Sequence, residues 1–265
     1  MYDGRHLRGL AYTLDRLSRA LNVLFVTSSG NRLLNDLPQP ARERYPDYLF
    51  EAPGRLLDPG TALNVLTVGG LAQHDATLDA RRNPGQIEHV PIARLGQPSP
   101  FTRCGPSVND AIKPDVVEYA GNVAFDRHGT PQTRGLGVLS FNSGFAAGRP
   151  LAEDAGTSYA APAVANRAAR LLSELPNASP HLLRALIGAH GKWPQASVDL
   201  LNPHDNADGR ERLLRAIGYG RIDDEALYQS LDRTVTLIAD ERIEVDRHHF
   251  FEVPVPPSWW DGARR

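Results

Sequence analysis

A serine at the start of a predicted helix is the strongest chemical feature of the sequence. Ser158 follows Gly156 and Thr157 and precedes an alanine-rich run that predicts a helix over about 157–174. The first N–H groups of a helix have no intrahelical partner, and the helix dipole is positive there. A serine at that place is suited to nucleophilic attack, because the same N–H groups can stabilise an oxyanion. The alternative interpretation is that Ser158 or Thr157 only caps the helix.

Five short segments form a larger pattern along the chain. Their sequences are V-L-F-V-T-S-S-G-N, S-P-F-T-R-C-G-P, I-K-P-D-V-V, G-T-S-Y-A-A-P and G-Y-G-R-I-D, at Val23–Asn31, Ser99–Pro106, Ile112–Val117, Gly156–Pro162 and Gly218–Asp223. In this order they resemble motifs of the subtilisin-like serine proteases, the subtilases, over about residues 7 to 230. Glu118-Tyr119-Ala120-Gly121 departs from the family pattern, which has A-P-G there.

The resemblance assigns roles to two residues. Ser158 corresponds to the catalytic nucleophile, and Asn31 corresponds to the asparagine whose side chain completes the oxyanion hole. The implied activity is that of a serine endopeptidase acting on a peptide or protein substrate. The resemblance requires no cofactor. Calcium occurs in the family, but we identify no calcium or other metal site, since His204–Gly209 fails the EF-hand pattern.

The aspartate and histidine of a serine-protease triad have no match that fits the family pattern. In subtilases both precede the oxyanion asparagine, and only thirty residues precede Asn31. Asp3 has no strand before it, and His6 is not followed by G-T and a helix. His128 belongs to a literal H-G-T, but it lies downstream of Asn31 and Pro131 follows directly. We therefore expect the C-terminal part of a catalytic domain, incomplete at its N-terminus and inactive alone.

Two functions stay open at this point. The first is a serine endopeptidase represented by its nucleophile and oxyanion half. The second is a non-catalytic subtilase-like module that binds peptides or partner proteins through the retained cleft. In-frame D-T-G and H-G-T motifs upstream of Met1 in the genome would favour the enzyme.

Short apolar runs predict the strands that must position these residues. Such runs are typical of buried parallel strands, and they lie at Asn22–Thr27, Ala62–Val68, Asp115–Tyr119 and Leu136–Ser140. We expect Gly69-Gly70 to end the second run. Together with the helices between them, these runs predict an α/β fold with a subtilisin-like parallel sheet flanked by helices.

Two further helices and a β-rich tail complete the expected architecture. Leu7, Leu10, Ala11, Leu14, Leu17 and Leu21 recur at helical spacing and predict an interior helix. Ser179 and Pro180 predict the start of a helix that runs to about His190. Residues 234–238 and 250–255 predict strands. We therefore divide the chain into a partial catalytic domain, 1–230, and the start of a β-rich C-terminal module, 231–265.

The composition of the chain excludes several kinds of partner and of structural site. The 265 residues carry 29 Lys and Arg against 31 Asp and Glu, a balance that gives no field to recruit nucleic acid or an anionic membrane. The longest apolar runs are too short to cross a bilayer. Cys104 is the only cysteine, which excludes an intrachain disulfide and a multi-cysteine metal site. Localisation and oligomeric state are not predicted.

Overall fold

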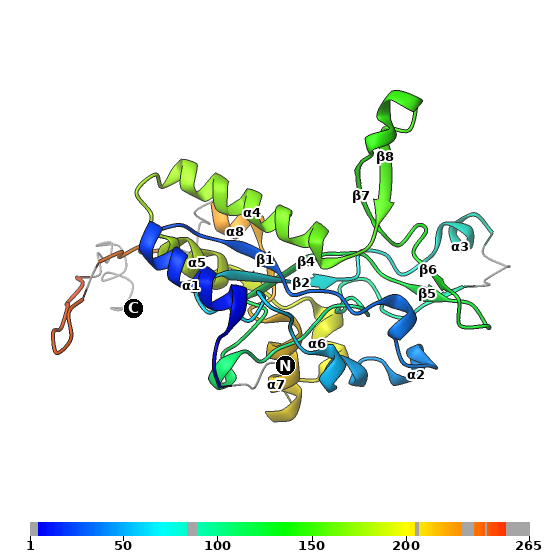
Figure 1. The fold of residues 1–265 in the computed structure, drawn as a ribbon, viewed down its shortest axis with the longest axis horizontal. Coiled ribbons are helices and arrows are strands. Elements are labelled where there is room, and N and C mark those ends of the chain that lie inside the picture. Colours follow the sequence, from blue (N-terminus) through cyan, green and yellow to red (C-terminus); the bar gives the residue numbers. More distant parts are fainter. Residues whose placement is uncertain (1–4, 84–88, 205–206, 229–235, 242, 253–265) are drawn as a thin grey trace, which may run out of the picture.

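The computed structural model describes residues 5–83, 89–204, 207–228, 236–241 and 243–252 (Figure 1). Its main sheet has the strand order β1-β2-β4-β10-β9. These strands are Val26–Ser28, Leu66–Leu71, Val116–Tyr119, Arg221–Ile222 and Gly191–Lys192. β1, β2, β4 and β10 are mutually parallel, whereas β9 pairs antiparallel with β10. The expected α/β class with a parallel sheet is therefore confirmed.

Helices cover both faces of this sheet, with α4 on one side and α7 on the other (Figure 1). Val68 and Val116 pack with α4 and α5 in one apolar core, whereas Leu71 and Val117 pack with α7 in a second. The alternation follows from the pleat, which sends successive strand side chains to opposite faces. The helices are α1 Gly9–Leu21, α2 Ala41–Arg44, α3 Leu78–Arg82, α4 Thr157–Glu174, α5 Pro180–Ala189, α6 Gln195–Leu201, α7 Ala207–Ile217 and α8 Asp224–Tyr228.

The sequence predicted two of these helices closely. α4 has the predicted bounds, and α5 ends one residue earlier than expected. The side chain of Ser179 accepts a hydrogen bond from Leu182 N at 3.1 Å, which confirms it as the N-cap of α5.

The second strand was predicted to begin and to end too early, at Ala62 and Val68. β2 covers Leu66–Leu71, so Gly69 and Gly70 lie inside it and do not end it. A methyl group on Gly69 would lie 2.8 Å from Pro114, and one on Gly70 would lie 2.8 Å from Ala120. Glycine is therefore needed here for close packing between β2, β4 and the residues on either side of β4.

The fourth apolar run was wrongly assigned to the parallel sheet. It forms β7, Val138–Phe141, which pairs antiparallel with β8, Leu151–Asp154. Figure 1 shows this hairpin projecting away from the sheet. Its residues are half-buried or exposed, and Phe141 is 91% exposed. A smaller sheet contains β3 Val90–Pro91, β5 Ala124–Phe125 and β6 Pro131–Gln132.

The first helix buries only part of the apolar face that was predicted, since Ala11 is fully buried and Leu14 packs in the same core. Three of its leucines, Leu10, Leu17 and Leu21, are exposed, and its buried residues include Asp15. The Asp15 carboxylate accepts hydrogen bonds from the backbone N–H of Leu63 at 2.9 Å and from that of Asn64 at 2.7 Å. These long-range polar contacts help to orient α1, which leaves Leu10, Leu17 and Leu21 exposed.

The predicted β-rich tail lies partly outside the described residues. Within 236–241 and 243–252 the structure contains no strand, so the described part of the prediction is wrong. The boundary at residue 230 stays a prediction. Among the described residues, no helix is long and apolar enough to span a membrane.

Candidate active site

The amino end of α4 is the centre of the candidate site. Gly156 precedes the helix, Thr157 is fully buried in its first position, and Ser158 is exposed. Gly156 N donates to Ala120 O at 2.8 Å, which ties the start of α4 to the chain leaving β4. Ser158 therefore presents its hydroxyl to solvent from a fixed helix terminus.

Asn31 lies directly against this terminus, although it is more than 120 residues away in sequence. It follows β1, and its Oδ1 accepts hydrogen bonds from Thr157 N at 2.9 Å and from Thr157 Oγ1 at 3.0 Å. Because both partners donate to this atom, the oxygen of the amide faces Thr157 and the nitrogen is directed elsewhere. A methyl group on Gly156 would lie 3.1 Å from Asn31 Nδ2. The structure therefore brings together the two residues singled out in the sequence.

Two donors at this terminus have no hydrogen-bond partner among the described residues. One is Asn31 Nδ2, and the other is the backbone N–H of Ser158, which lies in the first turn of α4. Both donors lie at the amino end of α4, which is the positive end of the helix dipole. Together they can stabilise a negatively charged oxygen bound beside Ser158.

Neighbouring loops hold Asn31 in place. Gly70 N donates to Thr102 Oγ1 at 3.0 Å, and Thr102 forms an isolated antiparallel bridge with Asn31. Gly30 has a φ of 91°, a conformation that favours glycine. A methyl group on Gly70 would also lie 3.2 Å from Thr157 Cγ2. The sheet therefore approaches α4 closely at the point where Asn31 contacts it.

A buried ionic cluster anchors α4 further along its length. Glu118 is 4% exposed and pairs with Arg167 of α4 at 2.8 Å and with Arg221 at 2.7 Å. Arg167 also pairs with Asp224 at 2.6 Å. Glu118 is the first residue of the departure from A-P-G noted in the sequence, and that departure was the available signal for this cluster.

No described histidine is hydrogen-bonded to Ser158. His128 lies in the turn between β5 and β6, is exposed, and accepts a hydrogen bond from Arg127 Nε at 3.0 Å. His74 follows β2, and burial, followed by the charge of Arg81, lowers its pKa. Asp3 lies outside the described residues.

Cys104 is a core residue, and the described residues contain no cluster of possible metal ligands. Cys104 is fully buried, and burial raises the pKa of its thiol to about 12, so it is a protonated core residue at neutral pH. Within the described ranges, no group of three or more His, Cys, Asp or Glu residues is arranged to hold a metal ion.

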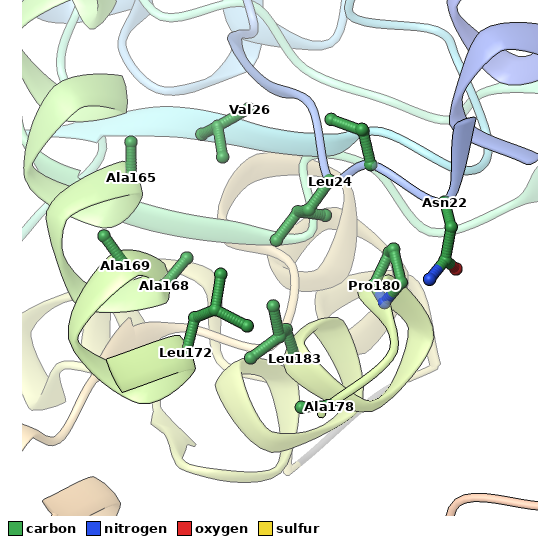
Figure 2. Close-up of a pocket in the computed structure, with 11 residues that line it drawn as sticks. Asn22, Leu24, Val26, Ala165, Ala168, Ala169, Leu172, Ala178, Pro180 and Leu183 are labelled. Atoms are coloured by element: carbon green, nitrogen blue, oxygen red, sulfur yellow. The ribbon is translucent and has the colours of Figure 1, made fainter. Parts of the chain in front are cut away.

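An apolar cavity of about 330 Å³ lies beside the edge strand β1 (Figure 2). In Figure 2, Leu24 and Val26 approach the small residues of α4, among them Ala165 and Ala169. Leu183 of α5 closes another side. The cavity lacks charged lining residues and does not include Ser158, so it is distinct from the candidate catalytic groups.

Comparisons with known proteins agree with the sequence resemblance. The model of the subtilase family matches residues 4–220. The protein y4bN of Sinorhizobium fredii (strain NBRC 101917 / NGR234) is 36% identical over 269 residues, an overlap that covers 99% of this chain and 61% of y4bN. The chain thus spans about three fifths of the length of that relative.

Several solved structures are similar at low sequence identity. A protease from Pseudoalteromonas arctica PAMC 21717 has 18% identity and a TM-score of 0.47, covering 84% of this chain and 47% of that one. MycP1 without its N-terminal propeptide has 18% identity and a TM-score of 0.45, covering 88% and 60%. The prenylagaramide maturation protease PagA has 18% identity and a TM-score of 0.43, covering 86% and 57%.

Proposed function

The chain belongs to the subtilase family, and we propose that it supplies the nucleophile and oxyanion donors of a serine endopeptidase. In this proposal Ser158 Oγ attacks the carbonyl carbon of a peptide bond. Asn31 Nδ2 and Ser158 N–H then hold the oxygen on which negative charge develops. The tetrahedral intermediate then collapses: the C–N bond breaks, the amine takes up a proton and leaves, and an acyl-enzyme remains on Ser158 Oγ, which water hydrolyses in a second step.

One observation carries the proposal. The hydrogen bonds from Thr157 to Asn31 Oδ1 leave the amide nitrogen of Asn31 as a preoriented donor at the amino end of α4, 3.1 Å from where a methyl group on Gly156 would lie. A donor that is fixed before reaction stabilises the transition state without having to be reoriented. Asn31 Oδ1 already accepts the hydrogen bond from Thr157 N that a capping side chain would accept. Ser158 is therefore not needed as the cap of α4.

Attack by Ser158 also requires a group that accepts its proton. The histidine that fills this role in the family has no matching motif here, and no described histidine is bonded to Ser158. We therefore expect the 265-residue chain alone to hydrolyse peptides very slowly. In the related subtilisin, loss of the histidine lowers turnover by about 10⁶.

The experiment compares the wild-type chain with Ser158→Ala, using a fluorophosphonate probe and fluorogenic peptides. We expect slow probe labelling that requires Ser158, little peptide hydrolysis, and faster labelling when imidazole is added as an external base. Fast hydrolysis that disappears in Ser158→Ala would reveal a base within this chain, and His128→Ala and His74→Ala would then test the two candidates. Labelling that persists in Ser158→Ala would contradict the assignment of the nucleophile.

A non-catalytic module that binds peptides is the second candidate function. It is favoured by the absence of a histidine partner for Ser158 among the described residues. If this candidate is correct, Ser158→Ala will bind peptides as the wild type does, and Ser158 will not react with the probe even in imidazole.

A further inference from the structure

The outer edge of β1 is unpaired among the described residues. β1 is an end strand of the main sheet, and β2 is its partner there. Phe25 and Ser29 form backbone hydrogen bonds with β2, at 2.9 and 2.8 Å. Because successive peptide groups of a strand point to opposite sides, those of Val26 and Ser28 point away from β2. No described residue forms a hydrogen bond with these two peptide groups.

Apolar side chains line one face of the sheet beside this edge. Leu24 and Val26 line the cavity of about 330 Å³, together with Ala165 and Ala169 of α4 (Figure 2). Leu172 lies further along the same side of α4 and is 42% exposed. An apolar side chain that entered this cavity would be removed from water between β1 and α4.

Leucines of α1 lie beside the same edge, on the opposite face of the sheet. Leu14 of α1 packs in one core with Phe25, whose side chain faces away from α4. Asp15 contacts the backbone just before β2. The flank of α1 opposite to Asp15 therefore faces away from β2, toward the open edge of β1. This flank contains three leucines that are 38% to 61% exposed, namely Leu10, Leu17 and Leu21.

The chemistry of a matching partner follows from these surroundings. An unpaired strand edge is a template for another strand. Strands of parallel sheets are covered on both faces and are apolar on both. The relative y4bN contains additional sequence, since the overlap with this chain leaves about two fifths of y4bN uncovered.

We propose that the free edge of β1 is the docking site for an apolar β-strand of a partner polypeptide, added parallel to β1. Alternate side chains of this strand enter the cavity beside α4 and cover the leucines of α1. The partner corresponds to the part of y4bN outside the overlap.

The docking site lies beside the candidate active site. β1 leads directly to Asn31, which contacts the start of α4. Because parallel strands end at the same edge of a sheet, the chain that leaves the added strand emerges on the side of Asn31 and Ser158. This is where a proton acceptor is needed, and in this respect alone the inference rests on the proposed function.

The test titrates the Ser158→Ala chain with the part of y4bN outside the overlap, produced as a separate polypeptide. We expect a one-to-one complex. Hydrogen exchange at the amides of Val26 and Ser28 should be fast in the free chain and slower by about tenfold or more in the complex. The Thr27 amide faces β2 and is the internal control, with slow exchange in both states.

Lysine substitutions locate the two apolar faces of the docking site. Leu172→Lys and Leu17→Lys should each weaken binding by about tenfold or more, because burial of one leucine contributes about 10- to 100-fold in affinity. Ser173→Lys on α4 and Tyr12→Lys on α1 are the matched controls, since both residues are exposed on other sides of their helices. If melting shows that a leucine variant is unfolded, the corresponding serine substitution replaces it.

The outcomes separate this inference from the proposed function. Absence of binding, or binding without protection of Val26 and Ser28, would overturn the docking site. Protection of these amides in a dimer of the chain alone would assign the edge to a second copy and also overturn it. Binding that protects both amides but leaves probe labelling of wild-type Ser158 slow would support the docking site and count against the catalytic proposal.

Discussion

Replacing Asn31 by aspartate separates the two roles that we assign to its side chain. Oδ1 accepts two hydrogen bonds from Thr157, at 2.9 and 3.0 Å, whereas Nδ2 is the proposed oxyanion donor. Asn31→Asp keeps an acceptor in the same place and removes the donor. Asn31→Ala removes both.

The two variants should differ in stability. A hydrogen bond contributes about 0.5–1.5 kcal/mol to folding, so losing two lowers the free energy of unfolding of Asn31→Ala by about 1–3 kcal/mol. Asn31→Asp should retain the wild-type value or exceed it by about 0.3–1 kcal/mol at neutral pH, because a carboxylate is favourable at a helix amino end.

Both variants should lower the reactivity of Ser158. Loss of one oxyanion donor lowers turnover by about 10²–10³ in subtilisin. We expect a reduction of at least that size in the rate at which the fluorophosphonate probe labels Ser158 in imidazole. The decrease should be larger for Asn31→Asp, since the introduced negative charge repels the developing oxyanion.

Urea unfolding and probe labelling are measured on the same preparations. Thr157→Val is the control, because it removes one of the two donors to Asn31 and leaves Asn31 Nδ2 in place. It should cost about 1 kcal/mol in stability and little in labelling rate. Equal destabilisation by Asn31→Asp and Asn31→Ala would refute the assignment of the amide oxygen. Wild-type labelling in Asn31→Asp would refute the donor role.

Three further predictions concern the elements that hold the site. Gly70→Ala places a methyl group 2.8 Å from Ala120, so it should lower the free energy of unfolding by about 1–3 kcal/mol. Gly144→Ala is the control, because the atom nearest to its added methyl group is 3.4 Å away. Equal melting temperatures for the two variants would contradict the packing argument. Glu118→Ala leaves two arginines without a shared partner and should cost about 3–5 kcal/mol in urea unfolding, whereas exposed Glu211→Ala should cost less than about 0.5 kcal/mol. The hydrogen bond from Arg167 lowers the pKa of Asp224, so its contribution to stability is present above the ordinary pKa near 3.9 and is lost as pH falls through the folded value. Melts between about pH 2 and 6 should show a shallower acid slope for Asp224→Asn, and unchanged slopes would argue against this coupling.

Sequence patterns predicted the helices and strands whose buried face depends on neighbouring residues in the sequence. α4 and α5 follow from apolar periodicity and from the cap at Ser179, and the cores of β1, β2 and β4 follow from short apolar runs. Elements oriented by distant contacts were predicted less well. The buried face of α1 depends on Asp15 reaching backbone groups nearly fifty residues away, and no periodicity contains that information.

The candidate site shows the same division. Asn31 and Ser158 were singled out by their resemblance to subtilase motifs, and the structure places them together. The double donation from Thr157 to Asn31 spans 126 residues, so it requires the folded chain.

The contacts of α4 also determine how a proton acceptor can reach Ser158. The helix is fixed at its start by Asn31 and by the hydrogen bond from Gly156 to Ala120. Further along, it is fixed by the ion pair between Arg167 and buried Glu118. Moving Ser158 toward a distant base would break these contacts together, at a cost of several kcal/mol by the magnitudes used above. Under the proposed function, the base must therefore come to Ser158, and Ser158 and Asn31 are held in place whether or not a base is bound.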